Sequence, residues 1–261
     1  MLTADLFASK TALVMGSTSG MGLKTAELLA RSGARTVYLN GRDAAAGAEV
    51  CIGLAREYPQ TKFEFIAADY SKPEELADLF AQVKSRGNGL DVFVHTCMSL
   101  GRWPMPFLKT DRDYWQDTLK GMFLSLLECC SHAVPMMLER GGGSIVSIAS
   151  DGGKVPTPSE SVLGAAMAAQ VMFLKVLAIE VGRQGIRVNA VLPSVTSGTR
   201  SYDAGMAREH TRHMFESAAQ KARLGVPTAE DVANTIVFLS SSLAKHVTGQ
   251  AVSVNGGISV F

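Results

Sequence analysis

The chain has 261 residues, with 25 lysines and arginines against 24 aspartates and glutamates and a formal net charge of +1. This length predicts one large α/β domain, and the balanced charge without a basic tract argues against a nucleic-acid or membrane-surface role. The four cysteines form no Cys-x-x-Cys pair, the N-terminus has no signal-peptide pattern, and the five histidines are scattered. We therefore expect a reduced, cytoplasmic protein without a metal site.

The first predicted strand covers 11–15 and runs directly into a glycine-rich turn, which a helix from Leu23 to Ser32 follows. Strand, glycine-rich turn and helix form the geometry of a dinucleotide-phosphate site, because the glycines let the backbone approach the phosphates and the helix amino end faces them. The alternative is that the glycines only let the helix pack against the sheet. The residues expected to contact a cofactor here are Gly16, Ser17, Ser19, Gly20, Met21 and Gly22.

Two further strands, 36–40 and 63–67, end at positions that bear on the choice of cofactor. An acid after the second strand would bind the ribose hydroxyls of NAD, and here Gly41 stands at that position, followed by Arg42. NADP is therefore at least as well suited as NAD, unless Arg42 is only a solvated loop residue. Asp69 and Tyr70 follow the third strand, where such folds contact the adenine.

The remaining elements continue the alternation of strands and helices. Ser71 is expected to cap a third helix, and Thr228 with Asp231 begins a late helix that reaches Leu243. The polar stretch 196–224 is expected to be an inserted helical lid beside a cleft. Further strands are predicted at 90–94, 144–148, 187–192 and 249–257, and long helices at 115–135 and 161–181. The pattern predicts a Rossmann-like, doubly wound parallel α/β sheet of about seven strands with helices on both faces, in a single domain over 1–261.

Several motifs in this order resemble the short-chain dehydrogenase/reductase family over nearly the whole chain. They are Gly16-x-x-x-Gly20-x-Gly22, the Asp69 turn, Leu119-Lys120-Gly121, Gly143-Ser144-Ile145-Val146 followed by Ser150, Arg187-Val188-Asn189-Ala190-Val191-x-Pro193, and Thr248-Gly249-Gln250 with Asn255-Gly256-Gly257. The resemblance implies hydride transfer between a nicotinamide cofactor, NAD or NADP, and an alcohol or ketone. It also implies four residues that act as one unit: a Tyr acid–base, a Lys that lowers the pKa of the Tyr and holds the ribose, a Ser that orients the carbonyl, and an Asn that holds a relay water.

Of these four positions, only Ser150 keeps the residue that the resemblance implies. The Tyr position holds Leu163, the Lys position holds Met167, and the Asn position holds Thr118. Neither Leu nor Met can transfer a proton, so no catalytic residue is assigned. Losing general acid–base catalysis removes roughly two to four powers of ten in rate, and losing a donor to the oxyanion removes roughly two to three more.

The strand ends around the nicotinamide position depart from the family as well. The family's Asn-Asn-Ala-Gly reads His95-Thr96-Cys97-Met98 here, and a side chain at Met98 would intrude on the cofactor; the family's Pro-Gly reads Pro193-Ser194. His95 as a base and Cys97 as a nucleophile are conceivable replacements, but we favour the interpretation that both pack at the strand end. Lys154 and Glu160 are interpreted as solvated loop charges.

We therefore predict a catalytically degenerate family member that persists as a structural or regulatory subunit of an active paralogue, in a heterodimer or heterotetramer. Family members pair through two long helices, and here these are apolar enough for a subunit interface: Met122, Phe123, Leu126, Leu127, Val171, Met172, Leu174 and Leu177. NAD or NADP would bind through the glycine-rich turn unless this binding is lost. The alternatives are an active NAD(P)-dependent oxidoreductase, or a lyase on this fold, with non-standard residues, and a dinucleotide-binding sensor.

Overall fold

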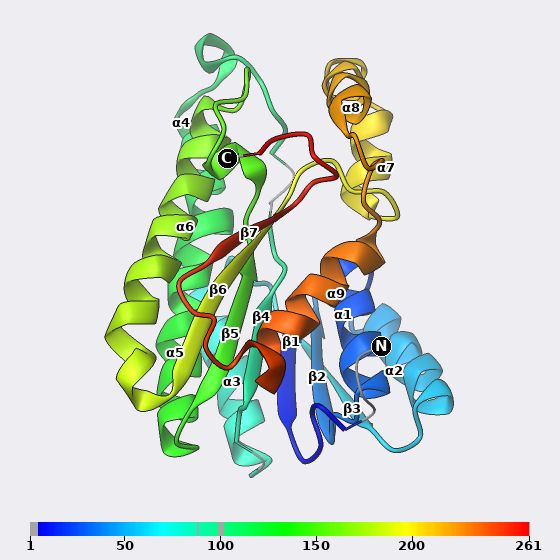
Figure 1. Ribbon diagram of the computed structural model, residues 1–261, viewed down its shortest axis with the longest axis vertical. Helices are drawn as coiled ribbons and strands as arrows, with labels where there is room; N and C mark the ends of the chain where they lie inside the picture. Colours follow the sequence, from blue (N-terminus) through cyan, green and yellow to red (C-terminus); the bar gives the residue numbers. More distant parts are fainter. Residues whose placement is uncertain (1–4, 88, 99–101, 261) are drawn as a thin grey trace.

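A single seven-stranded parallel sheet forms the centre of the protein, in the strand order β3-β2-β1-β4-β5-β6-β7 (Figure 1). The computed structural model describes residues 5–87, 89–98 and 102–260. The strands are β1 (Thr11–Met15), β2 (Thr36–Gly41), β3 (Lys62–Ala67), β4 (Val92–His95), β5 (Gly143–Ile148), β6 (Ile186–Pro193) and β7 (Ala251–Val254). The order reverses between β1 and β4, and such a reversal opens a crevice at the carboxyl ends of the strands, where α/β folds bind ligands.

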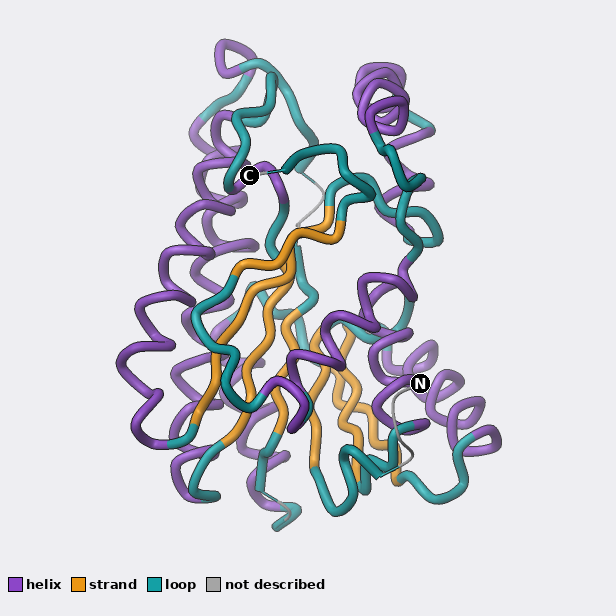
Figure 2. The backbone as a smooth tube through the Cα atoms, in the orientation of Figure 1, coloured by secondary structure: helices purple, strands orange, loops and turns teal. Residues whose placement is uncertain are grey.

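Helices cover both faces of this sheet, which confirms the predicted doubly wound architecture (Figures 1 and 2). One layer contains α1 (Gly20–Arg31), α2 (Ala44–Glu57) and α9 (Ala229–Ser240). The other contains α3 (Pro73–Ser85), α4 (Arg112–Thr118), α5 (Ser125–Glu139) and α6 (Ser161–Val181). Each layer encloses its own apolar cluster against the sheet, because strands buried on both faces present hydrophobic side chains in both directions.

The predicted long helix at 115–135 is longer and is divided into three parts. The π-helical stretch Leu119–Leu124 joins α4 to α5, and the Ser125 hydroxyl donates to the Gly121 carbonyl at 2.9 Å within it. Across the layer, the Gln170 amide of α6 donates to the Met122 carbonyl. The helical stretches Arg112–Glu139 and Ser161–Gln184 have the length and composition of membrane spans, and in this fold they pack side by side as one layer on the sheet (Figure 1). The π-helical stretch directly follows Thr118, which stands where the family resemblance implies an Asn.

The segment 196–224 contains two helices, α7 (Arg200–Met206) and α8 (Glu209–Lys221), which stand beyond the carboxyl ends of the strands (Figure 1). The Tyr202 and Phe215 rings stack between the two helices, with their centroids 5.9 Å apart. Arg208 lies over the Trp103 ring at 4.7 Å, and His210 Nε2 is 3.3 Å from the Ser159 hydroxyl. These contacts connect this helical segment to the loop after β4 and to the loop before α6.

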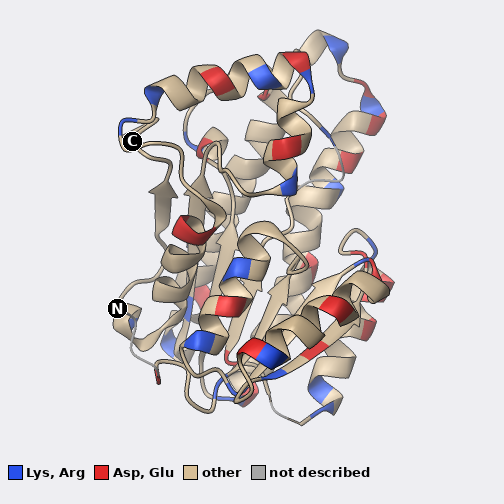
Figure 3. Ribbon diagram, turned by 90° about the vertical axis from the view of Figure 1, so that its right-hand side faces the viewer, with Lys and Arg blue, Asp and Glu red and all other residues tan. Residues whose placement is uncertain are grey.

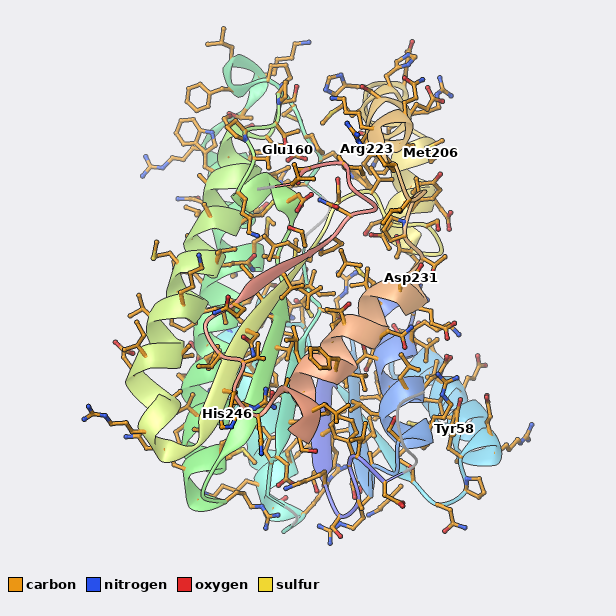
Figure 4. The ribbon with its side chains drawn as sticks, in the orientation of Figure 1. Tyr58, Glu160, Met206, Arg223, Asp231 and His246 are labelled. Atoms are coloured by element: carbon orange, nitrogen blue, oxygen red, sulfur yellow. The ribbon has the colours of Figure 1, made fainter. Side chains whose placement is uncertain are left out.

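Two expectations about helix starts have different outcomes. The box at α9 is confirmed, because the Thr228 backbone N–H donates to the Asp231 carboxylate at 2.8 Å and the Asp231 N–H donates to the Thr228 hydroxyl at 3.2 Å (Figure 4 labels Asp231). The cap at Ser71 is wrong: α3 begins at Pro73, and the Ser71 hydroxyl donates to Asp69 at 2.8 Å instead. Because its hydroxyl is bonded to the Asp69 carboxylate two residues upstream, Ser71 does not cap the helix.

Three-residue 3₁₀ turns complete the described secondary structure at Phe107–Lys109, Asp151–Gly153, Gly182–Gln184 and Ser242–Ala244. Acidic and basic side chains alternate over the helices on the side that Figure 3 shows, which carries α8, α9, α1 and α2. No single sign of charge dominates this face, in agreement with the near-zero net charge.

Candidate cofactor and catalytic site

The glycine-rich turn lies where β1 ends and α1 begins, beside the reversal of strand order. Gly16 and Gly20 have φ angles of +69° and +57°, which favour glycine. A Cβ atom at Gly22 would lie 2.4 Å from the Gly16 carbonyl oxygen and 2.7 Å from Thr96 Oγ1, so only glycine fits there. The helix that follows has no side-chain cap at Ser19 and no acid in its first turn. Its first N–H groups therefore face the crevice without an internal anion.

Two of the predicted contact residues in this turn are engaged within the fold. The Ser17 hydroxyl is buried, donates to the Val14 carbonyl at 2.8 Å and accepts from the Asn40 N–H at 3.0 Å. Ser17 therefore holds the turn against β2, and its contact with a cofactor stays a prediction. Met21 packs against the apolar cluster of the α1 layer. The sequence analysis did not predict the role of the buried Asn40, which connects Ser17 to the ends of β2 and β3 through hydrogen bonds.

Arg42 and Asp69 lie together at the ends of β2 and β3, where the adenine half of a dinucleotide is expected. Burial opposes the charged form of Asp69, but bonds from the Ser71 N–H and hydroxyl, with Arg42 and Lys72 nearby, hold the pKa of this carboxyl below its usual value. A Cβ atom at Gly41 would lie 2.8 Å from Thr18 Cγ2, so a larger residue here would require Thr18 to move. Tyr70 is half-buried and packs against the core on the α3 side, so its ring is partly committed to packing.

Leu163 and Met167 lie in one apolar group, which we call the methionine cluster: Tyr114, Met122, Leu163, Ala166 and Met167, with Met98, Met105 and Val162 packed against it. Ser150 precedes the turn Asp151–Gly153, and its hydroxyl accepts from the Gly152 N–H at 3.3 Å. The Thr118 hydroxyl is buried and has no hydrogen-bond partner among the described residues. At positions 163 and 167 the groups that lie in this cluster are therefore hydrocarbon and thioether.

Met98 has a particular place in this arrangement because it contacts two clusters at once. It packs against the core of the α1 layer and against the methionine cluster between α4 and α6. That this side chain intrudes on a cofactor stays a prediction.

Glu160 is not the solvated loop charge that the sequence suggested. It lies at the start of α6 (Figure 4), and a Cβ atom at Gly152 would lie 2.6 Å from Glu160 Oε2 and 3.2 Å from Met167 Sδ. Burial raises the pKa of this carboxyl to about 7. The glycine at 152 provides the space that the carboxyl occupies, directly beside the methionine cluster.

Lys154 also departs from the interpretation as a solvated charge. Its ammonium donates to the Ala251 carbonyl at 2.7 Å and lies 3.5 Å from the Ser253 hydroxyl. It joins the loop after β5 to β7, almost a hundred residues later in the chain, which no local pattern reveals.

His95 and Cys97 are packing residues, as favoured from the sequence. His95 is fully buried, its Nδ1 is 3.3 Å from the Ser147 hydroxyl, and burial lowers the pKa of its imidazole to about 4. Burial raises the pKa of the Cys97 thiol to about 12, so the thiol stays protonated and is not a nucleophile. Among the described residues, no group of three or more His, Cys, Asp or Glu is placed to hold a metal ion.

Comparisons with known proteins agree with this fold. A family model described as enoyl-(acyl carrier protein) reductase matches residues 16–259. A 3-oxoacyl-[acyl-carrier-protein] reductase of Chlamydia trachomatis is 28% identical over 257 residues, covering 98% of this chain and 99% of the relative. A "probable short-chain type dehydrogenase/reductase" of Bradyrhizobium diazoefficiens is 31% identical over 257 residues, covering 97% and 88%.

Among solved structures, L-sorbose reductase of Gluconobacter frateurii, in complex with NADPH and L-sorbose, superposes with a TM-score of 0.88. The two chains are 27% identical, and the match covers 97% of this chain and 98% of that one. This chain belongs to the short-chain dehydrogenase/reductase family, a class of oxidoreductases with NAD(P)-dependent members.

Proposed function

We propose that this chain is a non-catalytic, cytoplasmic subunit of a hetero-oligomeric NAD-dependent alcohol or hydroxyacyl-CoA dehydrogenase, in which an active paralogue performs the chemistry. The observation that carries the proposal is the methionine cluster: Leu163 and Met167 fill the places of the acid–base Tyr and its Lys with apolar atoms. The scaffold around them is intact, which is what a subunit needs if its role is to support a partner.

The nearest phenol does not replace the missing Tyr. Tyr114 lies in the methionine cluster and donates to the Trp103 carbonyl at 2.9 Å. Burial, with the Glu160 charge nearby, raises the pKa of this phenol. Proton transfer to a carbonyl at neutral pH needs a phenol pKa shifted in the other direction. Ser150 alone can orient a carbonyl but supplies no proton donor of matched pKa.

The partner surface that fits this proposal is the outer face of α5 and α6. The residues Met172, Val176 and Ile179 lie three to four positions apart on α6 and are 61%, 44% and 81% exposed. Leu124 and Leu138 add exposed apolar side chains on the neighbouring helical stretch. Family members pair through these two helices, and a paralogue with the same helix pair is the partner that we propose for this face.

The assembly that we propose is of the type of hydroxy(phenyl)methyl-succinyl-CoA dehydrogenase, an enzyme of aromatic hydrocarbon catabolism, whose inactive subunit this chain resembles. What supports this assignment is the loss of both Tyr and Lys on an otherwise intact fold.

The test is co-expression of the tagged chain with its genomic neighbours, followed by native mass measurement. We expect a second family member with an intact Ser, Tyr and Lys to copurify in fixed ratio. Turnover of the complex should vanish when the Tyr of that partner is changed and should survive Ser150→Ala in this chain. As a matched interface test, Ile179→Glu should release the partner, whereas Ile52→Glu, at an exposed apolar position on α2, should not. A homo-oligomer with its own turnover would refute the proposal.

One observation favours a second candidate function, an oxidoreductase that uses Glu160 as its proton donor. A carboxyl whose pKa is about 7 is suited to general acid catalysis near neutral pH, and this one lies beside the Ser150 turn. This candidate predicts turnover by the isolated chain with NADH or NADPH and a carbonyl substrate. The turnover should then fall by two or more powers of ten in Glu160→Gln. Absence of turnover in a folded, isolated chain would leave the subunit role.

A further inference from the structure

A partly enclosed pocket lies at the amino ends of β4, β5 and β6, at the end of the sheet away from α7 and α8 (Figure 1). It is lined by the segment before β1, by the turn between α5 and β5, and by the last residue of α9 with the two that follow. Its volume is about 300 Å³. A cavity of this size has room for one small metabolite.

The charged side chains that line this pocket are unequal in sign. Lys10, Arg140 and Arg187 are basic, and Asp91 is the one acid among the described residues that line it. The carboxyl end of α9 adds about half a negative charge through the helix dipole. A net positive charge therefore remains. Low-dielectric walls concentrate the field of such charges, so the pocket attracts an anion more strongly than an open surface would.

Asp91 does not use up the donors of the cations around it. One oxygen of its buried carboxylate accepts from the Thr11 N–H at 2.9 Å, and the other lies 3.2 Å from Lys10 Nζ and 3.3 Å from Arg140 Nη2. Both ion pairs are longer than the roughly 2.7–2.9 Å of a close charge-assisted bond. Because lysine has three N–H donors and arginine has five, both side chains keep donors for a further acceptor.

The wall formed by the end of α9 contributes a fixed charge and an unpaired hydroxyl. Arg187 donates to the carbonyls of Leu239, Ser240 and Ser241 at 2.5, 3.1 and 3.0 Å. These three acceptors are neutral, so the guanidinium is held in place while it keeps its charge. The Ser240 hydroxyl is buried and has no hydrogen-bond partner among the described residues. An unpaired buried hydroxyl is unfavourable, and an acceptor oxygen in the pocket would supply its partner.

We infer that this pocket binds a small metabolite dianion, whose two negative charges come from a phosphate monoester or from a dicarboxylate. Lys10 and Arg140 donate to its oxygens, and Arg187 supplies the fixed charge behind them. A ligand in this place contacts three strands, the end of α9 and the segment before β1, so its binding stabilises the whole fold. The pocket lies at the end of the sheet opposite the crevice and is independent of the proposed function.

The experiment is thermal unfolding of the full chain, titrated with inorganic phosphate, glycerol 3-phosphate, succinate and acetate at pH 8, with KCl added to keep the ionic strength constant. We expect saturable stabilisation by at least one dianion with a Kd of about 1 mM, since two charge-assisted hydrogen bonds provide this affinity. Acetate, with one charge, should bind at least about tenfold more weakly. The tighter of glycerol 3-phosphate and succinate identifies the source of the dianion. Amide hydrogen exchange over 140–144 and 240–242 should slow in the bound chain, which locates the ligand.

Four variants test the residues of the pocket. Lys10→Gln and Arg140→Gln should each weaken dianion binding about tenfold, whereas Arg56→Gln, at an exposed arginine of α2, should leave it unchanged. Asp91→Asn removes the competing acid and keeps an oxygen for the Thr11 N–H, so it should strengthen binding. A general loss of stability does not produce opposite effects at neighbouring positions. Lys10 is half-exposed, so its variant tests the pocket whether or not Asp91→Asn folds.

Two results would overturn the inference. One is the absence of saturable stabilisation by any of the dianions at constant ionic strength. The other is saturable binding that Lys10→Gln and Arg140→Gln both leave unchanged, because the anion would then lie elsewhere, for example at the glycine-rich turn. Neither result bears on the subunit role, which copurification with an active partner decides.

Discussion

Replacing Glu160 by Gln should stabilise this protein at alkaline pH and leave its stability nearly unchanged in acid. The carboxyl lies against Gly152 and Met167, and burial raises its pKa from 4.5 to about 7. An acid whose folded pKa is raised favours the native state only while protonated. Above pH 4.5 the unfolded chain releases this proton first, so native stability falls as the pH rises from about 4.5 to about 7.

The size of the effect follows from the shift. A pKa difference of this size corresponds to about 3 kcal/mol of native stability lost by pH 8. The amino end of α6, next to Glu160, favours the carboxylate by about 0.3 to 1 kcal/mol and reduces the loss. Glu160→Gln keeps the shape of the side chain and cannot ionise. It should therefore exceed the wild type in unfolding free energy by roughly 2 to 3 kcal/mol at pH 8 and match it near pH 4.5.

Urea unfolding at four pH values between 4.5 and 8 measures this difference. Other titrating groups act equally on both proteins and cancel. The matched control is Glu49→Gln, at an exposed position within α2, which shows what replacing a surface carboxylate does to the unfolding free energy. A Glu160→Gln variant that is no more stable than the wild type at pH 8, or one whose advantage is the same at pH 4.5 and 8, would refute the burial of this carboxyl.

Three further results are expected. Because burial lowers the pKa of His95 from 6.5 to about 4, the contribution of this residue to native stability should fall by about 3 kcal/mol as the pH falls from 6.5 to 4, opposite in sign to the Glu160 contribution. Measured by urea unfolding in the Glu160→Gln background, His95→Asn should flatten this acid slope, and an unchanged slope would count against the burial. Burial raises the pKa values of the Cys97, Cys129 and Cys130 thiols, so these thiols should resist iodoacetamide at pH 8 in the native chain and react after unfolding. Half-buried Cys51 should react first, as peptide mass analysis of the labelled chain would show. Thr228→Ala should cost about 1 kcal/mol of unfolding free energy through loss of the α9 capping box, and an unchanged midpoint would show that the box contributes nothing.

The sequence by itself determined the architecture of this protein and the residue types at its expected catalytic positions. Alternating apolar strands and helical stretches specify a parallel sheet with two helical layers, because each element type has its own hydrophobic period and parallel strands are buried on both faces. The glycine spacing at Gly16, Gly20 and Gly22 specifies a turn that other residues cannot adopt. The loss of the acid–base pair is likewise legible from the residue types at 163 and 167, since Leu and Met have no proton to transfer.

Only the tertiary structure decided how the polar groups near the site are used. From the sequence alone, Glu160 is interpreted as an exposed loop acid. Its actual environment is formed by Gly152 and Met167, which the fold places next to it. Ser17 reads as a ligand contact, yet Asn40, from the next strand, holds its hydroxyl. Desolvation and hydrogen bonding depend on atoms that are distant in the chain. A local sequence pattern reflects only hydrophobic periodicity and backbone preference, so it cannot predict these interactions between distant residues.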